Sequence, residues 1–407
     1  MKICIIGKYP PIQGGVSANN YWLSRALGEA GHKVFVVTNA EEADFEYKEE
    51  ILPKEAMWLE PRGVKVFNTS PLNRRFIPQY SAFVPKLASL AIDVIKREKA
   101  DVLYSNYLLP YGVAAYMTKQ ATGIPWFLDH AGSDITNLFD ESLLRPVFVE
   151  LFKKADLIVN SRHVQERVIK TGIVEEDKLS PLIGRDSRIM DKSFSKSAKP
   201  FNLSCCFYHF NKSLPVFTFL GKISQLKKTF AFVEAASLLP KGRFYLLFVT
   251  EKGPAHIQLS NMLAKFGLKE NSYLLPFQPP WRIPSIITAS TCIVAPESEE
   301  APYLPQGTHA SKICLEAMLC SRCAIIGEGM SKKFLYSGCK DKEHFLVVNP
   351  NNIKDFARKI KLVIDVPFLA YKIGKNARKF LDSRPFLSKR SVNIFIQNLK
   401  FTMIKAK

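Results

Sequence analysis

A chain of 407 residues is long enough for two hydrophobic cores, because single cores stop growing at about 250 to 300 residues. Its formal net charge of +20 favours anionic partners such as nucleotides, lipid phosphates or nucleic acid. The eight cysteines are scattered over both halves, which excludes a small disulfide-rich secreted domain. No zinc-finger or RNA-binding motif accompanies the spread-out basic residues, so we expect no nucleic-acid partner.

The apolar segments of the chain are short. None reaches the roughly 18 uncharged residues that suggest a membrane-spanning helix. The opening stretch MKICIIGKYPP has one short apolar strand before Gly and Pro, which does not fit a signal peptide. We therefore expect a cytoplasmic protein.

Predicted strands and helices alternate through the first half. The stretch KICIIG (residues 2–7) indicates a strand, residues 17–31 a helix and KVFVVTN (33–39) a second strand. Further strands are expected at 101–106, 125–130 and 155–161, with helices between them, for example at 81–99. Apolar strands alternating with amphipathic helices indicate a parallel sheet covered on both faces. We expect one doubly wound domain at residues 1–190.

The same alternation begins again after an irregular, Ser- and Lys-rich connection at residues 190–214. Strands are expected at 215–221, 244–250, 271–277, 291–296, 323–327 and 345–348, and helices at 227–240, 257–267, 310–320 and 352–365. This pattern predicts a second Rossmann-like domain at residues 212–385 and a last helix at about 386–407 that packs back on the first domain. Ligands bind beyond the carboxyl ends of parallel strands, so we expect the two domains to face each other across a cleft.

Two loops of the first domain carry candidate binding residues. Gly14 and Gly15, in GKYPPIQGGVSANN, allow a phosphate to approach the amides at the start of the next helix. An ordinary glycine turn is the alternative. His130 ends the strand PWFLDH, where it could donate to sugar hydroxyls or phosphate oxygens. A purely structural histidine is the alternative.

Two segments of the second domain are candidates for binding an anion. Lys222 and Lys227 follow the strand ending in FLG, and two ammonium groups could hold a diphosphate without a metal, although unpartnered surface lysines are common. Ser311 leads into the helix 310–320, whose first amides form a possible anion site. Glu316 lies among apolar residues there and requires either a dedicated hydrogen-bond set or a ligand such as a ribose.

Cys320 and Cys323 form the CxxC of the chain. A second cysteine or histidine pair at zinc spacing is missing nearby, and both residues lie in a helix-to-strand hydrophobic run. We interpret them as buried small side chains rather than as a metal or redox site.

Together these segments resemble the glycosyltransferases of family 4, the group 1 type. The similar segments are residues 14–38, ADLIVNS (155–161), LGKISQLKK (220–228) and KICLEAMLCSRCAII (312–326), in the family's order. The resemblance implies an α/β GT-B fold, that is, two Rossmann-like doubly wound parallel-sheet domains facing across a cleft. It also implies an acceptor-binding first domain and a nucleotide-sugar-binding second domain.

The resemblance also implies roles for individual residues. Lys222 and Lys227 match the residues on the donor diphosphate, Glu316 the acid that holds the nucleotide ribose, and His130 the histidine close to the transferred sugar. The expected site has His130, Lys222 and Lys227 as candidate catalytic residues, and Gly14, Gly15, Thr308, His309, Ser311, Lys312, Ile313 and Glu316 as donor-binding residues.

One position departs from the family's pattern. Thr308 stands where the family has the first glutamate of a pair, an acid that contacts the donor sugar. Glu297, Glu299 and Glu300 are possible stand-ins, although two prolines separate them from the helix. The alternative to an active enzyme is therefore a weakened or inactive nucleotide-sugar-binding protein of the same fold.

The expected activity is retaining transfer of a sugar from a nucleotide-diphosphate sugar to an acceptor hydroxyl, in cell-surface polysaccharide or glycolipid synthesis. We expect no metal and no cofactor, and a saccharide or lipid-linked acceptor. The helix 81–99 has an apolar stripe, with Arg74 and Arg75 ahead of it, that either packs on the core or contacts an anionic membrane. The stripe consists of Phe83, Leu87, Leu90, Ala91 and Val94.

Overall fold

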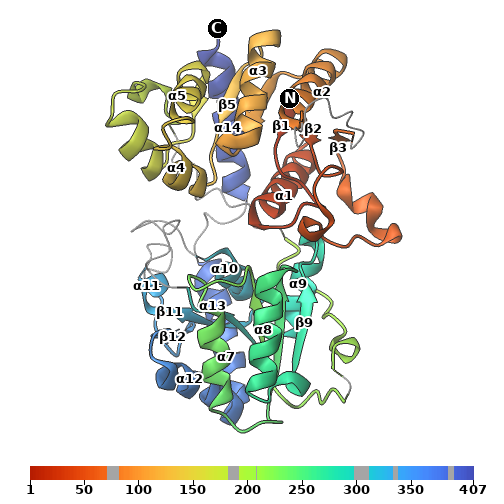
Figure 1. The fold of residues 1–407 in the computed structure, drawn as a ribbon, viewed down its shortest axis with the longest axis vertical. Coiled ribbons are helices and arrows are strands. Elements are labelled where there is room, and N and C mark those ends of the chain that lie inside the picture. Colours follow the sequence, from red (N-terminus) through yellow and green to blue (C-terminus); the bar gives the residue numbers. More distant parts are fainter. Residues whose placement is uncertain (71–81, 182–191, 208, 298–310, 333–337, 384–388) are drawn as a thin grey trace. The chain divides into compact units, whose positions relative to one another are not determined.

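The protein forms two compact units. The structure, a computed structural model, describes residues 1–70, 82–181, 192–207, 209–297, 311–332, 338–383 and 389–407. One unit comprises Met1–Ile189 with Phe386–Lys407, and the other Met190–Pro385. Each contains a six-stranded sheet, and Figure 1 shows the helices that cover it.

The sheet of the first unit is parallel throughout and has the strand order β3-β2-β1-β4-β5-β6. Its strands are β1 (Lys2–Ile6), β2 (Lys33–Thr38), β3 (Val64–Asn68), β4 (Val102–Ser105), β5 (Trp126–Leu128) and β6 (Leu157–Ile158). This order reverses direction between β1 and β4, and such a switch point is where doubly wound sheets bind ligands.

The helices of the first unit pack against the sheet and against one another. They are α1 (Gly15–Glu29), α2 (Phe83–Glu98), α3 (Val113–Thr122), α4 (Ser133–Leu138), α5 (Arg145–Lys154), α6 (Arg162–Val164) and the C-terminal α14 (Lys389–Lys405). Helix α14 contacts β4, β5 and β6 as well as α1, whereas α2 packs with α3 and against β1 and β2. The last helix of the chain is thus part of the first unit.

The apolar stripe of α2 faces the interior. Leu87, Ala91 and Val94 are completely buried, and Phe83 and Leu90 are partly buried. Of the two alternatives for this stripe, core packing is therefore correct and lipid contact through it is wrong. Arg74 and Arg75 lie outside the described residues.

The second unit repeats the topology of the first. Its parallel sheet has the order β12-β11-β10-β7-β8-β9, with the switch point between β7 and β10. The strands are β7 (Val216–Leu220), β8 (Tyr245–Thr250), β9 (Ser272–Pro276), β10 (Cys292–Ala295), β11 (Cys323–Gly327) and β12 (Leu346–Val348).

Both faces of this second sheet are covered. The helices are α7 (Thr229–Ser237), α8 (Pro254–Lys265), α9 (Ile283–Ala289), α10 (Lys312–Leu319), α11 (Glu328–Ser331), α12 (Ile353–Asp365) and α13 (Pro367–Asp382). Phe217 and Phe219 of β7 share one core with Phe232 of α7 and Phe356 of α12. Thr218 points to the other face and is buried as well, because successive side chains of a strand alternate between faces. The expected α/β class with two doubly wound parallel sheets is confirmed.

Short turns complete the described structure. Turns of 3-10 type lie at Phe45–Tyr47, Pro53–Leu59, Glu176–Lys178, Leu203–Cys205, Lys269–Asn271 and Pro280–Arg282, and π-helical turns at Leu108–Gly112 and Gln165–Ile169. No helix in the described part of the chain has the length and apolar character needed to cross a membrane.

Candidate functional site

The switch point of the second unit brings a lysine and a glutamate together. Lys227 lies in the loop after β7 and Glu297 lies two residues after β10, and these strands are neighbours in the sheet. The Lys227 ammonium donates a hydrogen bond to Oε1 of Glu297 and forms an ion pair with it. The Glu297 side chain is only 7% exposed, and the Lys227 side chain is 25% exposed.

The loop that carries Lys222 is held by an acid at the end of the next strand. Both carboxylate oxygens of Glu251, which follows β8, accept a hydrogen bond from the backbone N–H of Ile223, at 3.0 and 3.1 Å. Burial raises the pKa of Glu251 above its ordinary value, and those backbone N–H bonds and the charge of Lys222 oppose the rise. Lys222 itself is exposed at this edge of the sheet.

Helix α10 supplies a third group at the carboxyl edge of this sheet. Its Glu316 is 3% exposed, and the Glu316 Oε1 lies 3.8 Å from the ammonium of Lys312, one turn earlier. Ser311 occupies the N-cap position of the helix without a capping hydrogen bond from its side chain. It is buried, and its N–H donates to the sulfur of Met330 at 3.1 Å. Ile313 is partly buried, while Thr308 and His309 lie outside the described residues.

The glycine loop of the first unit leaves space beside the start of α1. Gly14 precedes the helix with a φ of 117°, in the region that favours glycine, and no side chain caps the helix there. A Cβ atom added at Gly14 or Gly15 would meet nothing within 4 Å. The described residues therefore leave room beside these two glycines at the start of α1.

A pair of asparagines lies at the switch point of the first unit. Asn20 of α1 and Asn106, which follows β4, exchange two side-chain hydrogen bonds, at 2.6 and 3.3 Å. The Asn20 amide also donates to the carbonyl of Lys8 at 2.7 Å. Gly7 follows the first strand directly. A Cβ atom there would lie 2.6 Å from the Asn20 side chain, so any larger residue would displace that asparagine. These contacts fix the beginning of the glycine loop.

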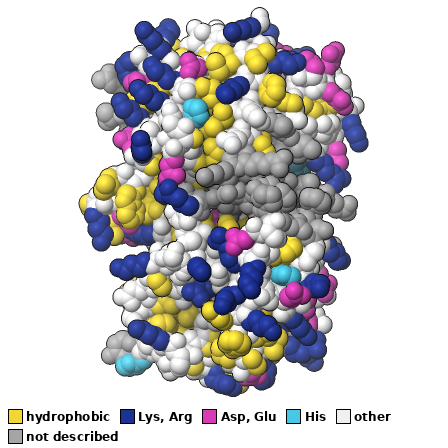
Figure 2. Space-filling model, turned by 180° about the vertical axis from the view of Figure 1, so that it is seen from behind, with side chains coloured by type: hydrophobic (Ala, Val, Ile, Leu, Met, Phe, Trp, Pro, Cys, Tyr) yellow, Lys and Arg dark blue, Asp and Glu magenta, His cyan; other side chains and the backbone are white. Residues whose placement is uncertain are grey.

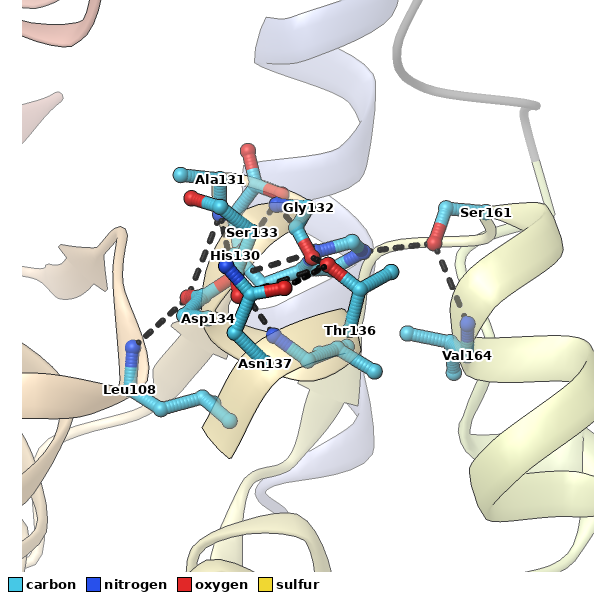
Figure 3. Close-up of polar contacts among 12 residues, drawn as sticks. Leu108, His130, Ala131, Gly132, Ser133, Asp134, Thr136, Asn137, Ser161 and Val164 are labelled. Carbon is cyan, nitrogen blue, oxygen red and sulfur yellow. Dashed lines mark hydrogen bonds and ion pairs between the residues drawn. The ribbon is translucent and has the colours of Figure 1, made fainter. Parts of the chain in front are cut away.

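His130 is enclosed in a hydrogen-bond network, which Figure 3 shows. Its ring is 2% exposed, and Nδ1 accepts a hydrogen bond from the N–H of Gly132 at 2.9 Å. Nε2 lies 2.6 Å from the hydroxyl of Ser161, which also caps α6 by accepting from Val164. In the neutral ring these partners place the proton on Nε2, which donates to Ser161. The protonated ring forms an ion pair with Asp134, whose Oδ1 lies 3.7 Å from Nδ1. Both ring nitrogens are thus directed at protein atoms in this conformation.

Asp134 anchors the same network. Its carboxylate accepts hydrogen bonds from the backbone N–H of Leu108 at 2.9 Å and of Ala131 at 3.0 and 3.2 Å. Burial alone would raise the pKa of Asp134, but the neighbouring His130 and these N–H groups lower it to about 2. Asp134 is therefore a structural carboxylate that holds the loop after β5.

The CxxC pair is buried, as expected. Cys320 and Cys323 are 1% and 0% exposed, and burial raises the pKa of the Cys320 thiol to about 12. Such a thiol stays protonated at neutral pH, and both side chains lie in the core as small buried residues.

The sequence did not predict two of the contacts that organise the second unit. For Glu251 the sequence holds one signal, because a charged residue directly after a buried strand marks the carboxyl edge of a sheet. For Glu297 the sequence predicts only a possible replacement for the acid expected at Thr308. The observed partner of Glu297 is Lys227, and the two residues are 70 positions apart in the chain. Glu299 and Glu300 lie outside the described residues.

Two doubly wound parallel domains, each with charged or glycine-rich loops at its switch point, define the GT-B class of proteins. The sequence profile of "Glycosyl transferases group 1" matches residues 207–380, and that of "Glycosyltransferase Family 4" matches residues 13–180. The chain therefore belongs to the family 4 glycosyltransferases of the group 1 type, which confirms the expected family.

Three known proteins are similar to this chain. A segment of 166 residues is 27% identical to N-acetyl-alpha-D-glucosaminyl L-malate synthase of Bacillus anthracis, and the match spans 40% of this chain and 40% of that relative. Sucrose-phosphate synthase from Thermosynechococcus elongatus superposes with a TM-score of 0.69 at 16% identity and 100% coverage of both chains. HepE of Anabaena, solved in complex with UDP-glucose, gives a TM-score of 0.64 at 18% identity, with 98% of each chain covered. At such low identity the two structures show the shared fold alone.

Proposed function

We propose that the protein is a retaining glycosyltransferase that moves a sugar from a nucleotide-diphosphate sugar to an acceptor hydroxyl. The observation that carries this proposal is the charged edge of the second unit. There Lys227 follows β7 at the switch point, Lys222 lies on the same loop, and α10 brings the buried Glu316. HepE, which shares the fold, is solved with UDP-glucose, and this supports a nucleotide sugar as the donor.

The proposed chemistry follows from where charge develops. As the bond between sugar and diphosphate breaks, negative charge grows on the leaving diphosphate. The ammonium groups of Lys222 and Lys227 and the first amides of α10 stabilise that charge, so neither a metal ion nor a cofactor is required. Glu316 accepts hydrogen bonds from the ribose hydroxyls in this arrangement. The glycine loop before α1 is a second proposed phosphate-binding segment, in the first unit.

His130 has a supporting part in this proposal. Its ring nitrogens are bonded to Gly132 and Ser161. We propose that it shapes the surface next to the transferred sugar, and that donation from its ring to the sugar requires Nε2 to exchange Ser161 for a sugar oxygen.

A panel of nucleotide sugars tests the proposal. Purified protein is incubated with UDP-, GDP- and other nucleotide-linked sugars, with and without a chelator, and binding and hydrolysis or transfer are measured. Binding together with chelator-insensitive turnover is the expected result. Absence of binding to every nucleotide and nucleotide sugar would overturn it.

A second candidate function is nucleotide-sugar binding with little or no transfer. It is favoured by Thr308, which has no carboxylate where the family has one. In the same panel, tight binding of a nucleotide sugar without hydrolysis or transfer would support this second candidate over the enzyme.

The acceptor is proposed to be a saccharide or a lipid-linked saccharide, in cell-surface polysaccharide or glycolipid synthesis at the inner face of the membrane. The end of α14 supports peripheral contact with an anionic membrane. Phe401 and Ile404 there are 40% and 66% exposed, and Lys400, Lys405 and Lys407 are exposed beside them in sequence. Apolar side chains among lysines suit a surface of anionic lipid headgroups.

A further inference from the structure

Glu297 is a fixed negative charge inside the proposed donor site. Its carboxylate pairs with Lys227 and is almost fully buried. Its backbone position is set by the neighbouring strand, because a Cβ at Gly327 would lie 2.4 Å from the carbonyl oxygen of Glu297. The acid is therefore built into the switch point between β7 and β10.

The two lysines of the site have different surroundings. Lys222 is exposed and forms no ion pair with another described residue. Lys227 is shielded by comparison, and its backbone N–H donates to the hydroxyl of Ser224 at 3.2 Å, which holds the turn that presents it. An anionic ligand that reaches Lys227 thus also meets the field of Glu297.

The two nucleotide species in a transfer reaction differ by one charge. In the nucleotide-diphosphate sugar the terminal phosphate is esterified and carries one negative charge. In the free nucleoside diphosphate the terminal phosphate ionises a second time, with a pKa of about 6, and so carries close to two negative charges at neutral pH. A buried carboxylate beside this phosphate penalises that additional charge.

We propose that Glu297 is a specificity-determining residue, which biases the site toward the nucleotide-diphosphate sugar and against the free nucleoside diphosphate. This inference rests on the proposed function, because it assumes that Lys227 meets the diphosphate. Its consequence is that the nucleotide product is held less tightly than the lysine pair alone would hold it, and leaves the site sooner.

The variant Glu297→Gln tests the inference. Glutamine keeps the size of the side chain and an oxygen that accepts from Lys227, but removes the charge. Dissociation constants are measured by calorimetry for UDP with UDP-glucose and for GDP with GDP-mannose, at neutral pH. We compare the dissociation constant of the free diphosphate with that of the matching nucleotide sugar. In the variant this ratio should fall by about threefold to tenfold, because one unit charge a few ångströms from the phosphate is removed. Glu297→Ala gives the same readout should the amide variant not fold.

Two control variants separate charge from structure. Glu297→Asp keeps the charge and should retain the wild-type ratio of the two dissociation constants. Glu343→Gln removes one exposed charge from the same unit and should leave that ratio unchanged. An unchanged ratio in Glu297→Gln, or an equal loss for both ligands, overturns this inference alone. Failure of the wild-type protein to bind these four compounds and every other nucleotide and nucleotide sugar of the panel overturns the proposed function together with it.

Discussion

Adjacent lysines after β7 have different environments, although the sequence presents them as a run. The Lys227 ammonium bonds Glu297 at the switch point, whereas that of Lys228 bonds the side-chain oxygen of Asn351 at 2.8 Å. Lys228 is also the N-cap residue that precedes α7, with a positive φ of 54°. Of these two lysines, only Lys227 pairs with an acid at the switch point, where the donor is proposed to bind.

Replacing Lys227 with Ala should raise the dissociation constant of the nucleotide sugar at least about tenfold, because a charge-assisted contact to the diphosphate is lost. Lys228→Ala is the matched control and should stay within about twofold of wild type. Calorimetry of both variants measures the effect. Since Glu297 loses its partner in the first variant, Lys222→Ala is measured as well and should weaken binding in the same direction. Equal affinities in wild type, Lys227→Ala and Lys222→Ala would contradict the proposed role of the lysines.

Asp134 illustrates a residue whose titration should affect stability. Its folded-state pKa of about 2 lies below the ordinary 3.8, so the folded protein binds its proton less readily than the unfolded chain. The stabilisation is fully present above about pH 4 and is lost as the pH falls from about 4 toward 2. It amounts to about 2 kcal/mol at neutral pH.

We expect Asp134→Asn to lower the free energy of unfolding at pH 7 by about 1 to 3 kcal/mol, because an amide replaces a carboxylate that accepts several N–H groups. The difference from wild type should shrink below pH 4. Denaturant titrations at pH 7 and pH 3 measure both effects. Asp177→Asn, which removes an exposed partner of Lys405, is the control and should change the stability by less than about 0.5 kcal/mol. A pH-independent difference would contradict the assignment.

At the level of elements, α14 completes the core of the first unit from the far end of the chain. The ring of Phe395 meets Tyr104 of β4 edge-to-face, with centroids 4.9 Å apart, and lies 6.0 Å from Phe127 of β5. Leu399 and Thr402 of the same helix are completely buried. Asn398, a polar residue of α14, is buried as well. These buried residues are three or four positions apart, so they form one face of the helix, which packs on the sheet.

Truncating Phe395 to Ala should destabilise the first unit by about 3 kcal/mol or more, because a large buried aromatic side chain leaves a cavity. Phe401→Ala, on the same helix but 40% exposed, should cost less than about 1 kcal/mol. Denaturant unfolding followed by far-UV circular dichroism compares the two variants. Equal losses would show that α14 does not pack as described.

The loops show what the pattern of elements could and could not predict. Strand and helix alternation placed Gly14, His130 and Lys227 at strand ends, since buried parallel strands are short apolar runs. The alternation could not show that His130 faces Ser161 and Gly132 instead of open space, because those partners lie on other segments. The alternation also could not show that the apolar stripe of α2 is buried by packing against α3 and the sheet.

The chain as a whole carries a formal net charge of +20, and its basic residues are spread along the sequence. Figure 2 shows Lys and Arg side chains scattered over the displayed face, between apolar and acidic ones. A spread of positive charge attracts anionic ligands from a distance and is screened by salt. It agrees with a small phosphate-bearing ligand better than with a nucleic-acid groove.

Membrane contact through the end of α14 is the prediction that belongs to this scale. The protein should sediment with vesicles that contain phosphatidylglycerol and not with neutral phosphatidylcholine vesicles, and about 0.5 M salt should reduce the binding. Ile404→Glu places an acid among the exposed lysines and should weaken vesicle binding several-fold. Ile257→Glu changes an equally exposed residue of α8 in the second unit and is the control. Identical vesicle binding by both variants would refute membrane contact through the end of α14.

The sequence alone determined the class of the protein, the repeated strand-and-helix pattern and the positions of Gly14, Lys222, Lys227 and Glu316. These features follow from local periodicity and residue type, which a single chain displays directly. Only the tertiary structure decided which side chains meet. Parallel strands bring distant carboxyl ends to one edge, and for that reason Lys227 is paired with Glu297 and the loop of Lys222 is held by Glu251. Those pairings depend on strand order, which arises from the packing of the whole domain and not from any one segment.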